Sequence, residues 1–247
     1  MIQTPDIQRP PKEYVDALRE IGSATCAGEL SRLGIRNAHL VGIRSFTPGV
    51  SIAGPALTLQ MMPKREDQYK QSEYSDPELQ LHRHVLYHTQ ASDVVVVDAR
   101  GDMSSGIFGD MMLTYFTGRG GAGVVIDGCI RDYPKAQRLG IGLFLKGTTP
   151  NFHTQTNIVP WAVNVPIAVA GCLVMPGDIM VADDDGAVVV PAALAPELVK
   201  KAGEHAEWED FSRQRLFEGG DLRKYYPLRE DGRAEYEEWR KSHPVQH

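Results

Sequence analysis

The chain has 247 residues, of which 42% are hydrophobic and 23% are charged, so it is long enough to bury a sizeable globular core. Its formal net charge of -6 argues against a nucleic-acid partner, because phosphate binding usually leaves a basic footprint. Three widely spaced cysteines suggest neither a disulfide framework nor a zinc motif, and no apolar run is long enough for a membrane span. We therefore expect a cytoplasmic protein that binds neither nucleic acid nor a membrane.

The first third of the chain predicts helices followed by strands. Residues 13–33 have a helical apolar pattern that Gly22 interrupts, and residues 39–62 have the pattern of short strands. The polar stretch 63–78 predicts a surface loop, and a helix is expected over residues 77–91. A helical start thus leads into β structure.

The central part of the chain predicts a parallel crossover unit. Residues 93–98 contain four consecutive valines, which is typical of a strand buried on both faces. A glycine-rich loop over 99–109 and a helix over 110–116 follow, and then buried strands at 124–127 and 143–146 with a helix between them. Strands that alternate with helices in this way predict right-handed parallel crossovers.

The last third of the chain changes character. Residues 157–191 carry short strands separated by turns, an antiparallel pattern, and residues 192–217 predict an amphipathic helix. The tail 219–247 is polar and aromatic. One composite domain of strands and helices, followed by a C-terminal extension, is the simplest interpretation.

Asp110 and the adjacent pair Arg131-Asp132, separated by twenty residues, form the candidate site. Each aspartate follows the carboxyl end of a predicted buried strand, where ligands of open α/β sheets bind. If the two strands are neighbours, they lie about 5 Å apart. A carboxylate pair can hold a divalent cation, and an arginine beside it can hold a small organic acid. The triplet therefore predicts metal-assisted chemistry on a carboxylate substrate.

A simpler interpretation makes both aspartates helix N-caps, each worth about 1 kcal/mol. It leaves Arg131 unexplained, because the helix macrodipole disfavours a cation at a helix N-terminus. The N-cap interpretation thus accounts for part of the triplet only.

Other clusters have a functional and a structural interpretation. His84 and His88, four residues apart and near His82, could chelate zinc or could simply pack on a helix. The segment 183–186 (DDDG) could bind calcium, although a hairpin turn fits its length better. Cys129, near Arg131, is a candidate nucleophile or a small buried filler.

The Asp-x20-Arg-Asp pattern, with Gly109 and a valine-rich strand before it, resembles the class II pyruvate aldolases of the 4-hydroxy-4-methyl-2-oxoglutarate aldolase type. The same superfamily contains the regulator of ribonuclease activity A. The resemblance extends from about residue 20 to about residue 200 and includes motifs in the same order: GPALTLQ at 54–60, GAGVVIDGCIRD at 121–132 and PGDIMVADDDGAVVVP at 176–191.

The resemblance implies a swivelling β/β/α-type α/β fold in a single domain, with a parallel β-α-β core and flanking antiparallel strands. This domain would span residues 1–218. The extension 219–247 carries no motif of the family, and its polar and aromatic composition suggests that it packs on a neighbouring subunit. The family precedent is a homotrimer or a hexamer with sites between subunits.

The resemblance also implies roles for the site residues. Asp132 would bind Mg²⁺ or another divalent cation such as Mn²⁺, Arg131 would contact the keto acid and stabilise its enolate, and Asp110 would hold a water that serves in proton transfer. The substrate carboxylate would meet the backbone N–H groups of four successive residues: Gly109, Asp110, Met111 and Met112.

Two accessory residues are less closely tied to the motif. The family carries an acidic residue at a position that falls on Gly28 here, with Glu29 next to it, so Glu29 is the candidate general base. Lys146, at the end of a predicted strand, is a candidate accessory cation or a rim lysine.

The activity that the resemblance implies is a metal-dependent lyase. It would cleave a 4-hydroxy-2-oxo acid, a small keto-acid substrate, to pyruvate and a second carbonyl compound through a metal-stabilised enolate, with oxaloacetate decarboxylation as a side activity. Two alternatives remain open: a non-catalytic binding protein that regulates a ribonuclease, and a sugar-acid dehydratase that uses the same metal site. A shared fold does not decide between them.

Overall fold

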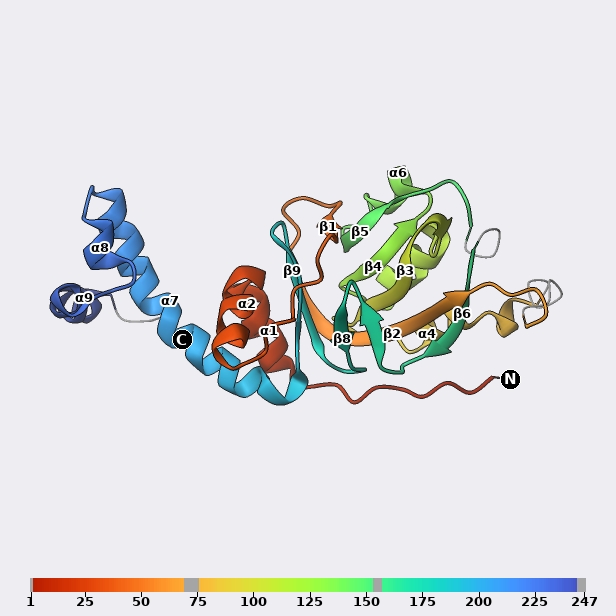
Figure 1. Cartoon of the computed structure of the whole chain (residues 1–247), viewed down its shortest axis with the longest axis horizontal. Coiled ribbons are helices and arrows are strands. Elements are labelled where there is room, and N and C mark those ends of the chain that lie inside the picture. Colours follow the sequence, from red (N-terminus) through yellow and green to blue (C-terminus); the bar gives the residue numbers. More distant parts are fainter. Residues whose placement is uncertain (1, 69–75, 153–156, 244–247) are drawn as a thin grey trace. The chain divides into compact units, whose positions relative to one another are not determined.

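The computed structural model describes residues 2–68, 76–152 and 157–243 (Figure 1). Its internal contacts divide the chain into two compact units, residues 1–196 and 197–247. This division lies earlier than the boundary at residue 218 that the sequence predicts, because nearly all of the long helix α7 belongs to the second unit. Of the surface loop expected at 63–78, residues 69–75 lie outside the described part of the chain.

Two helices open the first unit, α1 (Lys12–Ile21) and α2 (Ser23–Arg32). The predicted break is confirmed at Gly22, whose φ of 82° lies in the region that favours glycine. The carboxylate of Asp183 accepts hydrogen bonds from the backbone N–H of Ser23 at 2.7 Å and from its hydroxyl at 2.6 Å. A residue far along the chain therefore anchors the start of α2.

An 8-stranded sheet in the order β1-β5-β4-β3-β2-β9-β10, with β6 also paired to β2, forms the body of the first unit (Figure 1). Strands β2 to β5 are parallel to one another, and the other four pair antiparallel. The predicted α/β fold with a parallel core and flanking antiparallel strands is confirmed. The strands are β1 (Arg44–Ser45), β2 (Ile52–Pro63), β3 (Val94–Gly106), β4 (Gly123–Ile130), β5 (Gly142–Thr148), β6 (Ile158–Val163), β9 (Ile179–Asp183) and β10 (Gly186–Val190).

Shorter elements connect these strands. Strands β7 (Ile167–Val169) and β8 (Cys172–Val174) form a separate hairpin. The helices are η1 (Pro77–Leu79), α4 (Leu81–Tyr87), α5 (Asp110–Gly118), α6 (Tyr133–Ala136) and η2 (Ala192–Leu194). The single helix expected over residues 77–91 is therefore wrong: Gln80 adopts an extended conformation and separates η1 from α4.

The main core lies on the face of the sheet that α4 and α5 cover. Val95 and Val97 of β3 and Ile126 of β4 are fully buried there, as are Leu113 and Phe116 of α5. The period of two along each strand places these residues on one side. This packing fixes the start of α5 against the ends of β3 and β4.

The glycine-rich loop expected at 99–109 is mostly strand, because β3 continues to Gly106. The pairing register with β4 shifts between Val97 and Asp102, where Arg100 and Gly101 have φ values of 58° and 71°. Such an irregularity bends a strand without ending it. Strand β3 therefore carries the chain further than predicted before α5 begins.

The second unit is helical and comprises most of α7 (Ala195–Phe217), with α8 (Leu222–Tyr225) and α9 (Glu230–Ser242). The predicted amphipathic helix is confirmed, and most of the tail proves to be ordered in two further helices. Its core is aromatic: the Phe211 ring lies 5.9 Å from that of Tyr225 and 5.7 Å from that of Tyr236. Within the described residues, no helix is long and apolar enough to cross a membrane.

Candidate functional site

Two connections meet at the carboxyl ends of β3 and β4. The N–H of Ile107, just after β3, donates to the carbonyl of Cys129 in β4 at 2.9 Å. The N–H of Arg131, just after β4, donates in turn to the carbonyl of Phe108 at 3.0 Å. The backbones of the two connections therefore run side by side, which brings Asp110 and the Arg131-Asp132 pair to one place.

Gly109 is the point where the charged groups come closest to the backbone. A Cβ atom added here would lie 2.8 Å from Asp132 Oδ2 and 2.9 Å from Arg131 Nε. These two side-chain atoms are 3.4 Å apart, and the side chains are 34% and 43% exposed. Only a residue without a side chain leaves room for this arrangement.

Asp132 is held in an unusual backbone conformation. Its φ of 56° and ψ of 30° are left-handed, a region that aspartate visits more readily than most residues. Although Asp132 stands at the N-cap of α6, the described residues include no hydrogen bond from the α6 backbone to its carboxylate. Capping therefore does not explain this aspartate, and its carboxylate is left to face Gly109.

Asp110 is the first residue of α5 and forms an ion pair with a lysine. The Oδ2 of Asp110 lies 3.3 Å from Nζ of Lys135, which projects from α6. Because the N-cap of α5 is Gly109, Asp110 is not the N-cap that the simpler interpretation proposed. Lys135 lies outside the sequence motif, and its position about one helical turn after Asp132 is the signal that could have predicted it.

A cavity of 180 Å³ opens beside these groups. The candidate residues Gly109, Asp110, Met111, Met112 and Arg131 line it, whereas the Asp132 carboxylate lies next to it at Gly109. The remaining lining residues were not predicted for this pocket: Gln80, His82, Arg83, Gly106, Ile107 and Phe152.

The residues at the start of α5 line this cavity. The first N–H groups of an α-helix have no acceptor within the helix, and the helix dipole makes this end partly positive. Together with the guanidinium groups of Arg83 and Arg131, these N–H groups give the cavity the character of an anion site.

The three histidines do not form a metal cluster. His84 Nε2 is 2.8 Å from the carbonyl oxygen of Glu78, and His88 Nε2 is 2.8 Å from the hydroxyl of Thr4. Burial lowers the pKa of His88. Across the described ranges, no group of three or more His, Cys, Asp or Glu side chains is placed to hold a metal. Among the residues that the structure describes, the zinc interpretation therefore has no support.

The surroundings of the Asp132 carboxylate fit a hard divalent cation. Mg²⁺ takes oxygen ligands and commonly keeps several waters, so it needs few protein ligands. Asp132 offers a partly exposed carboxylate in a space that a Cβ at Gly109 would fill. The residues present are compatible with a Mg²⁺ or Mn²⁺ site that has a single direct protein ligand from this chain.

The two accessory residues lie elsewhere in the chain. Lys146 of β5 forms an ion pair with the buried Asp127 of β4, and neither residue lines the cavity. Glu29 of α2 is 3% exposed and forms an ion pair with Arg32, also away from the cavity lining. Within one chain, therefore, neither accessory residue reaches the triplet.

The two remaining candidates have structural roles. Cys129 is buried, and this burial, with a smaller effect of Asp102, raises the pKa of its thiol to about 11, so it is an inert filler as the simpler interpretation predicts. The segment 183–186 is the β9–β10 hairpin turn, in which the Asp184 carboxylate accepts a hydrogen bond from the Gly49 N–H at 2.9 Å.

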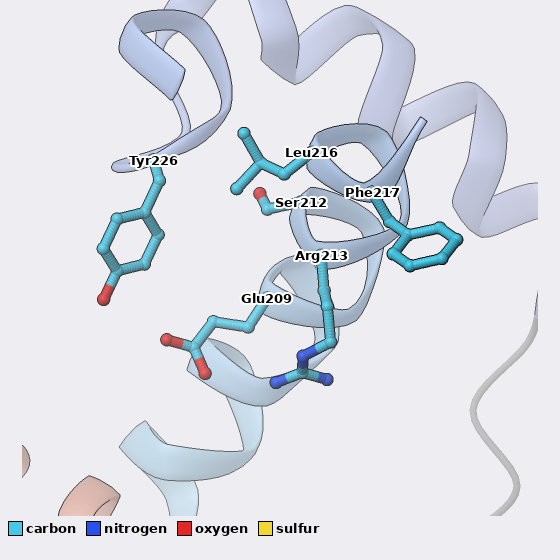
Figure 2. Close-up of a pocket in the computed structure, with 6 residues that line it drawn as sticks. All are labelled: Glu209, Ser212, Arg213, Leu216, Phe217 and Tyr226. Atoms are coloured by element: carbon cyan, nitrogen blue, oxygen red, sulfur yellow. The ribbon is translucent and has the colours of Figure 1, made fainter. Parts of the chain in front are cut away.

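A second pocket, of 490 Å³, lies in the C-terminal unit (Figure 2). Figure 2 shows Glu209 and Arg213 on one helix and Tyr226 across the opening from Glu209. Its lining has none of the residues that the sequence motif identifies, and one of its members, Phe217, is 94% exposed. The cavity at the ends of β3 and β4 remains the candidate functional site.

Comparison with known proteins points to one family. The model of the RraA-like family, described as Aldolase/RraA, matches residues 15–189. A Halalkalibacterium halodurans protein named "Putative 4-hydroxy-4-methyl-2-oxoglutarate aldolase" is 36% identical over 130 residues, which cover 53% of this chain and 60% of that relative. An uncharacterised protein from Methanocaldococcus jannaschii is 34% identical over 130 residues, covering 53% of this chain and 62% of that protein. Each match spans less than two thirds of the curated relative.

A solved structure resembles the chain over a longer stretch. RraAS2 from Streptomyces coelicolor, described as an unusual member of the RNase ES inhibitor RraA protein family, has 45% sequence identity to this chain and a TM-score of 0.76. The match covers 84% of this chain and 99% of that one. The fold, and 45% of the sequence over the matched stretch, are thus shared with a protein whose family description concerns ribonuclease inhibition.

Proposed function

Because the chain belongs to the RraA-like (Aldolase/RraA) family, we propose that it is a divalent-metal-dependent lyase. It cleaves a 4-hydroxy-2-oxo acid to pyruvate and a second carbonyl compound, and it decarboxylates oxaloacetate as a side reaction. The observation that carries this proposal is the convergence of the Arg131 guanidinium and the Asp132 carboxylate on Gly109, beside the start of α5.

Asp132 is the proposed metal ligand. Its carboxylate is partly exposed and has the hard oxygen atoms that Mg²⁺ and Mn²⁺ prefer. When bound, the cation supplies Lewis-acid stabilisation of the negative charge that develops on the pyruvyl fragment. Arg131 Nε lies 3.4 Å from Asp132 Oδ2 and favours this orientation of the carboxylate.

Arg131 and the start of α5 are proposed to bind the substrate. The guanidinium can donate charge-assisted, bidentate hydrogen bonds to the keto acid as its charge grows. The backbone N–H groups from Gly109 to Met112 are suited to the substrate carboxylate, because they point out of the first turn of a helix. Binding and charge stabilisation thus come from two adjoining connections.

Asp110 is proposed to act in proton transfer. Cleavage requires loss of the proton from the C4 hydroxyl group and gain of a proton at the methyl carbon of pyruvate. The Asp110 carboxylate lines the cavity, and Lys135 at 3.3 Å holds it in place. A water between Asp110 and the substrate would carry the proton.

Replacement of Asp132 tests the proposal. We expect Asp132→Ala to lower pyruvate formation from 4-hydroxy-2-oxo acids by about 100-fold or more in Mg²⁺-supplemented buffer, because the metal ligand is lost. Chelator treatment of the wild-type protein should abolish the activity, and Mg²⁺ or Mn²⁺ should restore it. Pyruvate is measured with coupled lactate dehydrogenase, and Asp185→Asn, at an exposed turn position, is the matched control. Full activity of Asp132→Ala would refute the proposal.

A second candidate function has its own observation. The 45% identity to RraAS2, whose family is described by RNase ES inhibition, favours a protein that binds and inhibits a ribonuclease. Titration of purified RNase ES with this chain, followed by RNA cleavage, tests it. Inhibition that Asp132→Ala leaves intact, in a protein that forms no pyruvate, would favour the regulator. Turnover of a sugar acid without pyruvate release would favour the dehydratase.

A further inference from the structure

Arg83 is a second arginine in the candidate cavity. It lies in α4, outside the sequence motif, and it lines the same 180 Å³ space as Arg131. Two guanidinium groups in so small a cavity repel each other unless an anion lies between them. The one carboxylate in the lining, that of Asp110, is already paired with Lys135.

The orientation of Arg83 is set by contacts at the inner nitrogen of its guanidinium group. Arg83 Nε donates a hydrogen bond to the hydroxyl of Tyr87 at 3.1 Å, and that hydroxyl donates to Glu78 Oε1 at 3.0 Å. Over the described residues, no carboxylate forms an ion pair with Arg83. No described carboxylate therefore pairs with the two terminal nitrogens of the guanidinium group. Their fixed planar geometry suits bidentate binding of a carboxylate.

We propose that Arg83 binds a second carboxylate, at the distal end of the substrate, so that the site selects dicarboxylic over monocarboxylic 2-oxo acids. This inference rests on the proposed function, since Arg131 and the start of α5 are taken to hold the 2-oxo-acid end. Arg83 then acts as a specificity-determining residue. The Glu78–Tyr87 pair positions it and is not expected to touch the substrate.

Ligand binding without turnover tests the inference. 2-Oxoglutarate and 2-oxopentanoate have the same chain length, differ in the distal carboxylate, and lack the 4-hydroxyl group that cleavage requires. By isothermal titration calorimetry in Mg²⁺ buffer, we expect the wild-type chain to prefer 2-oxoglutarate. Arg83→Gln should weaken 2-oxoglutarate binding by about 10- to 100-fold and change 2-oxopentanoate binding less than about 3-fold, because one charge-assisted interaction is lost.

Two further variants test whether the effect is specific to Arg83 and its orientation. Arg138→Gln removes an exposed arginine outside the cavity lining and should keep the wild-type ratio of the two affinities. Tyr87→Phe removes the hydroxyl that fixes Arg83 and should lower the ratio partially. Thermal unfolding of each variant checks that it is folded.

The outcomes separate this inference from the proposed function. Equal affinities in the wild-type chain, or an unchanged ratio in folded Arg83→Gln, would overturn the role of Arg83 even if the chain forms pyruvate. Absence of pyruvate from every 4-hydroxy-2-oxo acid would instead refute the lyase, and the affinity ratio would still decide whether Arg83 recognises a distal carboxylate.

Discussion

A single methyl group at Gly109 would occupy the space between Asp132 and Arg131. In Gly109→Ala the new Cβ would lie 2.8 Å and 2.9 Å from their charged atoms, so both side chains must shift. We expect pyruvate formation to fall about 10- to 100-fold, because small misplacements of catalytic groups are costly. The melting temperature should change little, since both charged side chains are partly exposed.

The matched control is Gly203→Ala in α7. A Cβ there meets no atom within 4 Å, and its φ is not positive. The free energy of unfolding should rise by about 0.5–1 kcal/mol, because alanine favours a helix interior. Wild-type activity of Gly109→Ala in the same assay would contradict the proposed geometry.

Asp98 provides a pH-dependent prediction at the same scale. Burial, with a smaller contribution from Asp127, raises the pKa of its carboxyl group. The folded state therefore holds the proton more tightly than the unfolded state. The resulting stability is fully present below the ordinary carboxyl pKa and is lost as the pH rises through the raised pKa of the folded state. Asp98→Asn removes this loss while keeping an oxygen that can accept the Arg100 N–H.

The expected result is a melting temperature about 1–3 °C above the wild type at pH 7, with a gain that shrinks as the pH falls to about 4. Differential scanning fluorimetry over this pH range measures it. Asp185→Asn, at an exposed position, should show no such trend. A lower melting temperature of Asp98→Asn at pH 7 would show that the charged form stabilises the fold.

The residues of the site differ in how far sequence could identify them. Asp110, Arg131 and Asp132 follow from strand ends and a fixed spacing, because adjacent parallel strands deliver their carboxyl ends to one edge. Arg83 and Lys135 do not follow in this way. Arg83 arrives on a helix from outside the motif, and Lys135 depends on how the short helix α6 turns back towards α5.

At the scale of elements, the strands were identified but their ends were misplaced. Four valines mark the buried part of β3, whereas its continuation to Gly106 is polar and contains Arg100 and Gly101 in left-handed conformations. Composition alone makes such a stretch look like a loop. Its pairing with β4 is a tertiary property that local sequence does not encode.

The C-terminal helices show a similar limit. The tail beyond residue 219 is polar, and the aromatic residues spaced along it come into contact only when the chain folds. Tyr225 and Tyr236 pack on Phe211, and Glu235 binds both the Tyr225 hydroxyl at 2.8 Å and Lys224 Nζ at 2.5 Å. This small aromatic core explains why the segment is helical and not an extended tail.

At the scale of the whole molecule, the openness of the site motivates a prediction of assembly. Met111 is 75% exposed beside the cavity, and Arg131 is also partly exposed, whereas stabilisation of a developing charge is stronger where water is excluded. We expect a second copy of the chain to cover this region in a homotrimer or a hexamer.

Size-exclusion chromatography with light scattering should therefore give three or six times the chain mass of 27.3 kDa. Specific activity should fall together with the measured mass when the protein is diluted. A monomer with full specific activity would contradict the prediction.

The bond between Ser23 and Asp183 has a consequence for synthesis on the ribosome. The two residues are 160 positions apart, so α2 leaves the exit tunnel long before the carboxylate that anchors its first turn. Strand β2 likewise cannot pair with β9, its antiparallel partner, until β9 has been synthesised. The N-terminal helices are therefore expected to dock late, after translation has passed the β9–β10 hairpin, and nascent chains halted earlier should leave the apolar side of α2 open to chaperones.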